Sequence, residues 1–147
     1  MEIVAVVGRS GAGKTHLIER MLPVLCSSGL DVATLKHTHH RVARDREGAD
    51  TFRHRQAGAH RAVLAGPGFC TVFTENEVPL GELVRMAGLG VDLLLIEGFK
   101  SVKELRKIEV VRGLPPLLEP AEVWMTVTAE ESDRVAEAIV ALLRSFS

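Results

Sequence analysis

The residues GRSGAGKTH (8–16) follow the hydrophobic run EIVAVV and precede a stretch with helical periodicity. The spacing Gly8-x4-Gly13-Lys14-Thr15 is typical of a phosphate-binding P-loop. Glycines in such a loop adopt backbone angles that other residues resist, so the backbone N–H groups can point inward around a phosphate. The chain is therefore predicted to begin with a buried strand, a phosphate-binding loop and a helix.

This loop predicts which residues contact a nucleotide. The helix that follows presents its positive N-terminus to the same phosphate. Lys14 would reach the β- and γ-phosphates, and the Thr15 hydroxyl would bind Mg²⁺. We expect the chain to bind a nucleoside triphosphate. The predicted nucleotide-binding residues are Gly8, Arg9, Ser10, Gly11, Ala12, Gly13, Lys14, Thr15 and His16.

A second Mg²⁺ anchor is expected from an acidic residue at the end of a neighbouring hydrophobic strand. Glu97 directly follows the run LLLI, and ligands collect at the carboxyl ends of parallel strands. Asp92 opens the same strand, so it should lie at the opposite end of the sheet. Glu97 is therefore predicted to bind the metal with Thr15 and, together with Lys14, to form the catalytic groups.

Apolar runs and helical patterns alternate along the chain. Strands are expected at 3–7, 31–37, 61–65, 71–75, 91–98, 107–111 and 122–127, with the glycine-proline turn GPG between the third and fourth. A helix is expected at 15–28, where Pro23 should kink it or shift its ends. A short helix is expected at about 50–58, with Asp50 as its N-cap. Two further helices are expected after Pro79 and after a capping box formed by Thr128 and Glu131. This alternation predicts a single α/β domain over residues 1–147, P-loop NTPase-like, with a mainly parallel sheet covered by helices on both faces.

Charge and cysteine content exclude several classes of protein. The net charge of the 147 residues is −1, so no basic field would attract nucleic acid or an anionic membrane. Cys26 and Cys70 are isolated and fit a reducing compartment. The first strand begins at residue 2, without a basic leader or an apolar segment of about 18 residues. We expect a cytoplasmic protein.

A second polar cluster, KHTHH (36–40), ends the second predicted strand, on the same side of the sheet as the P-loop. Three histidines in four residues are compatible with transition-metal ligands. However, no matching Cys or His pair occurs elsewhere, which favours contact with a phosphorylated or oxygen-rich ligand. Solvated loop histidines are the structural alternative.

Six motifs in this order resemble the molybdopterin-guanine dinucleotide biosynthesis protein B family (MobB). They are GRSGAGKT, KHTHH, Asp45 with Gly48 and Asp50, RQAGA (55–59), DLLLIEGFK (92–100) and KIEV (107–110). The resemblance covers about residues 1–112. The chain departs from the family pattern in three places: His16 stands where Thr is more frequent, Arg41 and Ala43 replace acids, and EGAD (47–50) replaces PGKD.

The resemblance implies a homodimeric, GTP-binding P-loop protein of molybdenum cofactor biosynthesis. Such a protein would assist the MobA-type guanylyltransferase that attaches GMP to molybdopterin, and molybdopterin or its guanine dinucleotide is a further implied partner. The implied cofactors are GTP and Mg²⁺, with Thr15 and Glu97 as metal ligands. The residues implied to border the substrate are His37, Thr38, His39, His40, Asp45, Asp50, Gly98 and Lys100.

Three functional classes remain open on the sequence alone. The first is an accessory protein with weak GTPase activity, because neither a water-positioning glutamine nor an arginine finger is signalled. The second is an ATP-dependent small-molecule kinase, with RVARDR (41–46) as a lid and Asp45 or Asp50 as base. The third is a binding module without hydrolysis. The chain has no Asn-Lys-x-Asp motif, so its guanine specificity is implied only by the resemblance.

Overall fold

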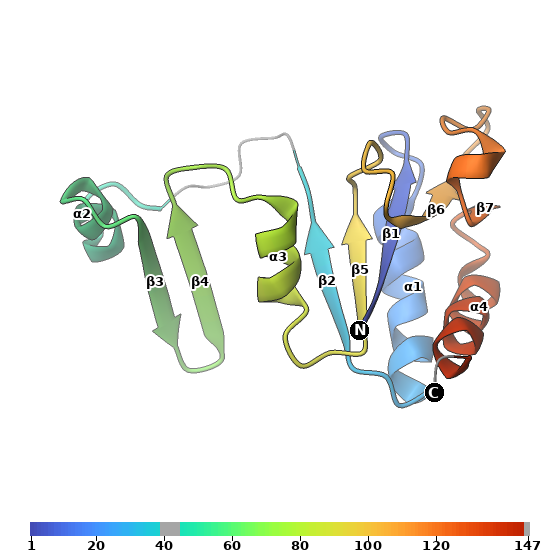
Figure 1. Ribbon diagram of the computed structural model, residues 1–147, viewed down its shortest axis with the longest axis horizontal. Helices are drawn as coiled ribbons and strands as arrows, with labels where there is room; N and C mark the ends of the chain where they lie inside the picture. Colours follow the sequence, from blue (N-terminus) through green and yellow to red (C-terminus); the bar gives the residue numbers. More distant parts are fainter. Residues whose placement is uncertain (39–44, 146–147) are drawn as a thin grey trace. The chain divides into compact units, whose positions relative to one another are not determined.

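The computed structural model describes residues 1–38 and 45–145 (Figure 1). Two compact units are present where one domain was expected. The P-loop unit comprises Met1–Thr38 and Val84–Ser147, and the hairpin unit comprises His39–Leu83. Each unit has its own sheet. In the described residues, no helix is long and apolar enough to cross a membrane.

The P-loop unit is built on a five-stranded parallel sheet in the order β2-β5-β1-β6-β7. Its strands are β1 (Glu2–Gly8), β2 (Val32–Lys36), β5 (Leu93–Glu97), β6 (Arg106–Val110) and β7 (Met125–Val127). From β1 the chain passes first to β2 and β5 on one side and later to β6 and β7 on the other. The carboxyl end of β1 is therefore a topological switch point, where open α/β sheets bind ligands.

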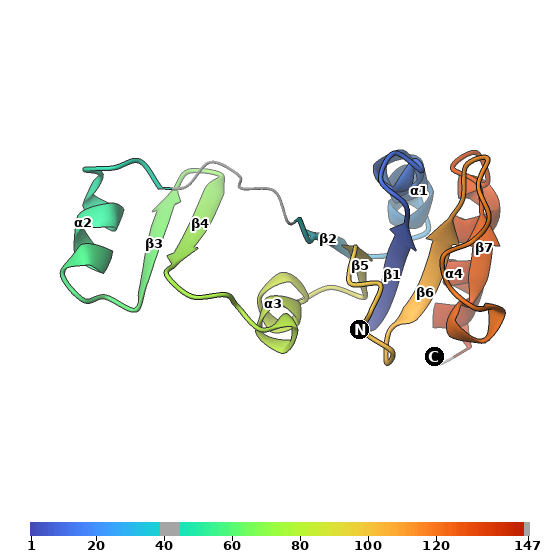
Figure 2. The ribbon, with the colours of Figure 1, turned by 90° about the horizontal axis from the view of Figure 1, so that it is seen from above.

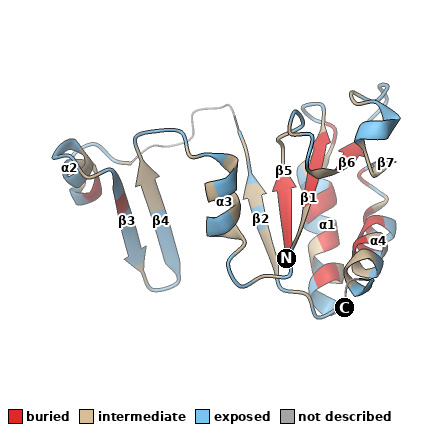
Figure 3. Cartoon of the chain, viewed as in Figure 1, coloured by how far each residue is buried: buried red, intermediate tan, exposed pale blue. Residues whose placement is uncertain are grey.

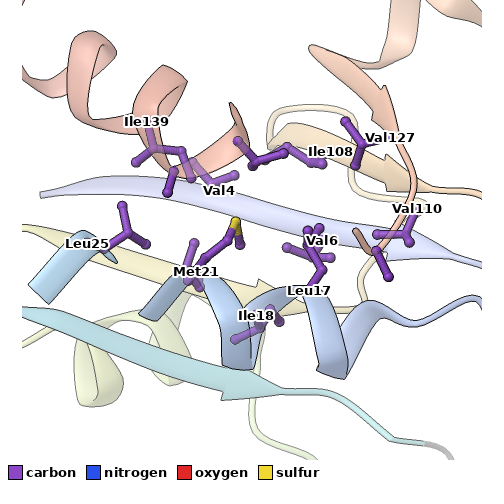
Figure 4. Close-up of a cluster of buried hydrophobic side chains, with 14 of the residues drawn as sticks. Val4, Val6, Leu17, Ile18, Met21, Leu25, Ile108, Val110, Val127 and Ile139 are labelled. Atoms are coloured by element: carbon purple, nitrogen blue, oxygen red, sulfur yellow. The ribbon is translucent and has the colours of Figure 1, made fainter. Parts of the chain in front are cut away.

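One face of this sheet is covered by α1 (Lys14–Ser27) and α4 (Ser132–Arg144), which also pack against each other. Alternate residues of the strands point to this face, and they meet Leu17, Met21 and Leu25 of α1 and Ile139 of α4 (Figure 4). All four side chains are fully buried. Each such burial contributes about 1.5–3 kcal/mol to folding, which holds α1, and hence the P-loop, against β1.

The opposite face of the sheet is also closed to solvent. Ala5, Leu94 and Ile96 are 0 % exposed there. Glu109 of β6 is buried as well, and its carboxylate accepts the backbone N–H groups of Leu117 and Leu118 at 2.5 and 3.3 Å. This buried acid therefore fixes the segment after β6 next to the sheet.

The hairpin unit contains α2 (Asp50–Gln56) and an antiparallel pair, β3 (Arg61–Gly66) with β4 (Phe69–Thr74). The helix α3 (Leu80–Ala87) spans the boundary between the units. Little of the hairpin is buried, in contrast to the central strands of the large sheet (Figure 3). Arg55 connects the elements of this unit. Its guanidinium forms ion pairs with Asp45, at 3.1 Å, and with Glu75. It also lies over the rings of Phe52 and Phe73.

Most element predictions are confirmed, including the mainly parallel sheet with packed helices. The helix α1 continues through Pro23 with ends shifted by one residue from the expected 15–28. Two cap predictions were wrong. Asp50 is the first helical residue of α2, with Ala49 as N-cap, and α4 begins at Ser132 with Glu131 as N-cap. The carboxylate of Glu131 still accepts the Thr128 N–H at 2.7 Å, and this bond, assisted by Arg134, lowers the pKa of Glu131.

Candidate nucleotide-binding site

The P-loop connects the carboxyl end of β1 to α1 at the centre of the parallel sheet (Figure 2). Three of its glycines have positive φ angles: Gly8 at 140°, Gly11 at 74° and Gly13 at 99°. Two of them are also sterically required. A Cβ on Gly8 would lie 2.4 Å from the Val110 carbonyl oxygen, and one on Gly13 would lie 2.8 Å from the Ala129 side chain. The loop is therefore held between β6 and the β7–α4 connection.

Lys14 begins α1 and turns back over the loop. Its ammonium donates to the carbonyl oxygens of Gly8 at 3.2 Å and Arg9 at 2.8 Å. Arg9, Ser10, Thr15 and His16 are exposed, whereas Ala12 is buried against the core. Most side chains of the predicted phosphate loop are thus accessible to a ligand, while Ala12 anchors the loop in the core.

Thr15 and Glu97 lie side by side although they are far apart in sequence. The Thr15 hydroxyl donates to Glu97 Oε2 at 2.9 Å. The Lys36 ammonium lies 3.2 Å from Glu97 Oε1 and donates to the Thr15 hydroxyl oxygen at 3.2 Å. Glu97 is only 13 % exposed, whereas Lys36 is 58 % exposed. The three side chains form one polar cluster beside the P-loop, here called the Thr15 cluster.

The oxygens of the Thr15 cluster fit the Mg²⁺ that the loop implies. A hydroxyl and a carboxylate are hard oxygen donors, and Mg²⁺ bound with a nucleotide takes few protein ligands because phosphates and waters supply the others. The ammonium of Lys36 already marks a position where both oxygens face a cation. In the described residues there is no group of three or more His, Cys, Asp and Glu side chains that could hold a metal.

Asp92, the alternative acid on β5, lies at the other end of the strand. Its carboxylate accepts the Asp31 N–H at 2.9 Å, and its carbonyl accepts the Glu2 N–H at 2.8 Å. These bonds join the amino ends of the strands. Asp92 therefore has a structural role away from the P-loop.

The other side of the P-loop is bordered by the segment after β6. Arg112 donates to the Gly11 carbonyl at 3.5 Å. A small cavity of about 60 Å³ lies between this segment and the loop, lined on the segment's side by Glu109, Leu114 and Pro115 among others. The segment after β6 therefore borders the P-loop on the side of the sheet away from the Thr15 cluster.

The predicted second site follows β2 and β5. His37 donates its backbone N–H to the Glu97 carbonyl at 2.9 Å, and its ring stacks on Phe99 with centroids 4.3 Å apart. Gly98 has φ 116°, and a Cβ there would lie 3.2 Å from that of His37. Thr38 and Lys100 are exposed. His37, Gly98 and Phe99 are thus brought together one residue beyond Lys36 and Glu97.

The other residues predicted for this site lie outside the described part of the P-loop unit. His39 and His40 lie outside the described residues. Asp45 belongs to the hairpin unit, where it is 5 % exposed and paired with Arg55. Asp50 is in the same unit, 88 % exposed and 3.7 Å from Arg53. Their assignment to a substrate site stays a prediction.

Two side chains at the P-loop were missed by the sequence analysis. The motif KHTHH contains Lys36 but assigns it no role, and no motif of the sequence includes Arg112. The alternation of side chains along a strand could have indicated that Lys36 points to the face of the sheet opposite that of His37. Arg112 reaches Gly11 across the sheet, a contact between segments about 100 residues apart that no local pattern indicates.

The chain is similar to known proteins over nearly its whole length. The family model for molybdopterin guanine dinucleotide synthesis protein B matches residues 3–129. The molybdopterin-guanine dinucleotide biosynthesis adapter protein of Escherichia coli is 35% identical, covering 96% of this chain and 83% of the relative. That of Haemophilus influenzae is 33% identical, covering 90% and 78%.

Solved structures agree with the fold. A crystal structure of molybdopterin-guanine biosynthesis protein B is 27% identical, with a TM-score of 0.66, and covers 97% of this chain and 99% of its own. Bacillus subtilis MobB has a TM-score of 0.66 at 24% identity and covers 96% and 97%. With a P-loop on a parallel sheet and this match over residues 3–129, the chain belongs to the molybdopterin guanine dinucleotide synthesis protein B (MobB) family.

Proposed function

We propose that this chain is a GTP- and Mg²⁺-binding adapter in molybdenum cofactor biosynthesis. It would assist the MobA-type guanylyltransferase that joins GMP to molybdopterin to form the guanine dinucleotide. The observation that carries the proposal is the Thr15 hydroxyl 2.9 Å from the Glu97 carboxylate beside the P-loop. The names of the relatives supply the pathway.

The parts of this site have distinct roles in nucleotide binding. The P-loop backbone and the N-terminus of α1 would hold the phosphates. Lys14 would exchange the carbonyls of Gly8 and Arg9 for phosphate oxygens, and Thr15 with Glu97 would hold Mg²⁺. Bound Mg²⁺ would neutralise charge on the terminal phosphates.

Hydrolysis is proposed to be slow. Efficient GTP hydrolysis requires a residue that orients the attacking water. The single glutamine of the sequence, Gln56, ends α2 in the hairpin unit. In the described P-loop unit, the side chains bonded to Thr15 are those of Lys36 and Glu97. These groups, with Mg²⁺, would stabilise the charge of the phosphates, but neither of them is an amide that could position the attacking water. A bound nucleotide of long lifetime suits an adapter that presents GTP to a transferase.

The hairpin unit supports the further proposal of a homodimer. An isolated two-stranded sheet is only marginally stable, and this one exposes Val63, Leu64 and Phe69 to 56, 46 and 52 %. Leu64 and Phe69 lie on one face of the strand pair and Val63 on the other. A second copy of the hairpin packed on the face of Leu64 and Phe69 would cover those two side chains. We expect light scattering to give twice the 16.0 kDa mass of one chain, and a mass of one chain would contradict the dimer.

Replacing Glu97 with glutamine tests the functional proposal. Glutamine keeps the size of the side chain but removes the negative charge that Mg²⁺ needs, so formation of the guanine dinucleotide cofactor should fall about tenfold or more. Cofactor is quantified in cells that depend on this chain for its production. The matched control is Asp92→Asn, on the same strand but at its other end, where an amide oxygen can still accept the Asp31 N–H. Normal cofactor yield with Glu97→Gln would refute a required Mg²⁺ site.

A further inference from the structure

We propose that Lys36 is a second phosphate-binding lysine, which contacts the terminal phosphate of the nucleotide and exchanges Glu97 for it when Mg²⁺ binds. The inference rests on the proposed GTP–Mg²⁺ function and adds a residue to it. Lys14 approaches the site from the P-loop, whereas Lys36 approaches from β2. Two ammonium groups from different elements would then act on the same end of the nucleotide.

The sheet register fixes the position of Lys36. It is the last residue of β2 and is paired with Glu97, the last residue of β5, which in turn is paired with Val6 of β1. Paired residues in neighbouring strands point to the same face of the sheet. Val6 points to the face covered by α1, so Lys36 and Glu97 point there as well. That face presents Thr15, in the first turn of α1, to both side chains.

The contacts of Lys36 are with the oxygens that a metal would require. Its ammonium lies 3.2 Å from Glu97 Oε1 and 3.2 Å from the Thr15 hydroxyl oxygen. The Thr15 hydroxyl and the Glu97 carboxylate would be the protein ligands of Mg²⁺. A cation held by these two groups and an ammonium close to the same oxygens would repel each other, so Lys36 would leave them when the metal is bound.

A displaced ammonium has one new source of negative charge nearby, the phosphate that arrives with the metal. Thr15 follows directly on the P-loop, so phosphates held by this loop, with Mg²⁺ neutralising their charge, would lie close to the Thr15 cluster. Lys36 is 58 % exposed, and its four-carbon stem can move from the carboxylate to a phosphate oxygen without leaving the site. The proposed charge-assisted hydrogen bond would be made to the γ-phosphate, so it would be missing in the complex with GDP.

Comparing GTP with GDP isolates this contact. We would measure the affinities of Lys36→Met for both nucleotides with Mg²⁺ by calorimetry. Methionine keeps the apolar stem and removes the charge. The ratio of GTP to GDP affinity should fall about tenfold or more, as expected for loss of one charge-assisted hydrogen bond. Lys36→Arg, which keeps the charge, should restore part of that ratio.

A second measurement follows the affinity for the metal in the complex with GDP. Mn²⁺, followed by electron paramagnetic resonance, should bind the GDP complex of Lys36→Met as tightly as that of the wild type or more tightly, because a competing cation is gone from Glu97. A merely structural lysine would weaken both nucleotides and the metal together. The matched control is Lys103→Met, an exposed lysine outside the Thr15 cluster, which should keep all wild-type values.

The outcomes separate the two proposals. If the wild type binds GTP and Lys36→Met keeps the wild-type ratio of GTP to GDP affinity, the assignment of Lys36 is wrong and the proposed function stands. If the wild type binds neither nucleotide, both proposals are wrong. Thermal unfolding of each variant confirms that the compared proteins are folded.

Discussion

Replacing Lys14 with alanine should lower the affinity for GTP–Mg²⁺ at least about a hundredfold, since each charge-assisted hydrogen bond to phosphate contributes roughly 1.5–3 kcal/mol. The ammonium of Lys14 is held over the loop by the carbonyls of Gly8 and Arg9, so it is already positioned where phosphate oxygens would meet it. Lys14 is the first residue of α1. Calorimetric titration of the variant with GTP measures the loss.

The fold should tolerate this substitution. The bond from Lys14 to the Arg9 carbonyl is exposed and the bond to the Gly8 carbonyl is partly buried. Water can replace the ammonium at these carbonyls, so the free energy of unfolding should change by less than about 1 kcal/mol. Lys103→Ala, which removes an exposed lysine elsewhere, serves as the control for loss of one positive charge. Wild-type GTP affinity in Lys14→Ala would show that the loop does not bind phosphate through this lysine.

Gly8→Ala should be the most destabilising single-methyl change in the P-loop unit. The φ angle of 140° is strained for any L side chain, and the added Cβ would lie 2.4 Å from the carbonyl oxygen of Val110. That oxygen belongs to the backbone of β6, which is paired with β1 at this residue. The strain and the forced separation of two central strands should together cost about 3 kcal/mol or more. Chemical denaturation measures this loss.

Gly29→Ala separates the two causes. Gly29 also has a positive φ, 85°, but nothing lies within 4 Å of the position that a Cβ would take. Alanine there should cost only about 1–2 kcal/mol, the penalty of the left-handed conformation. Equal losses for the two variants would contradict the contact between Gly8 and β6 as the source of the effect.

The P-loop and its acid were predictable because both depend on local rules. The glycine spacing identified the loop, and Glu97 followed from the tendency of parallel strands to gather ligands at their carboxyl ends. The placement of Glu97 2.9 Å from Thr15 agrees with that reasoning. Its role as a metal ligand stays a prediction.

Contacts that depend on register or on distant segments were not predictable. Lys36 meets Glu97 because their strands end at the same level, which the sequence does not specify. Arg112 contacts Gly11 from the segment after β6, about 100 residues further along the chain. The strands β3 and β4 were expected on either side of the turn GPG, but this pattern does not specify that, among the described residues, they pair only with each other. Asp45, which the resemblance implies borders the substrate, is buried and paired with Arg55, and the sequence does not specify this pairing.

The most direct test of the account is a titration of the wild-type chain with GTP and with ATP, each with and without Mg²⁺. The account predicts Mg²⁺-dependent binding of GTP that excess ATP does not displace. Guanine specificity has the least support from the residues of the site, and the comparison of GTP with ATP tests it directly. Equal binding of both nucleotides, or a preference for ATP, would contradict the proposed adapter function and direct attention to a phosphoryl acceptor.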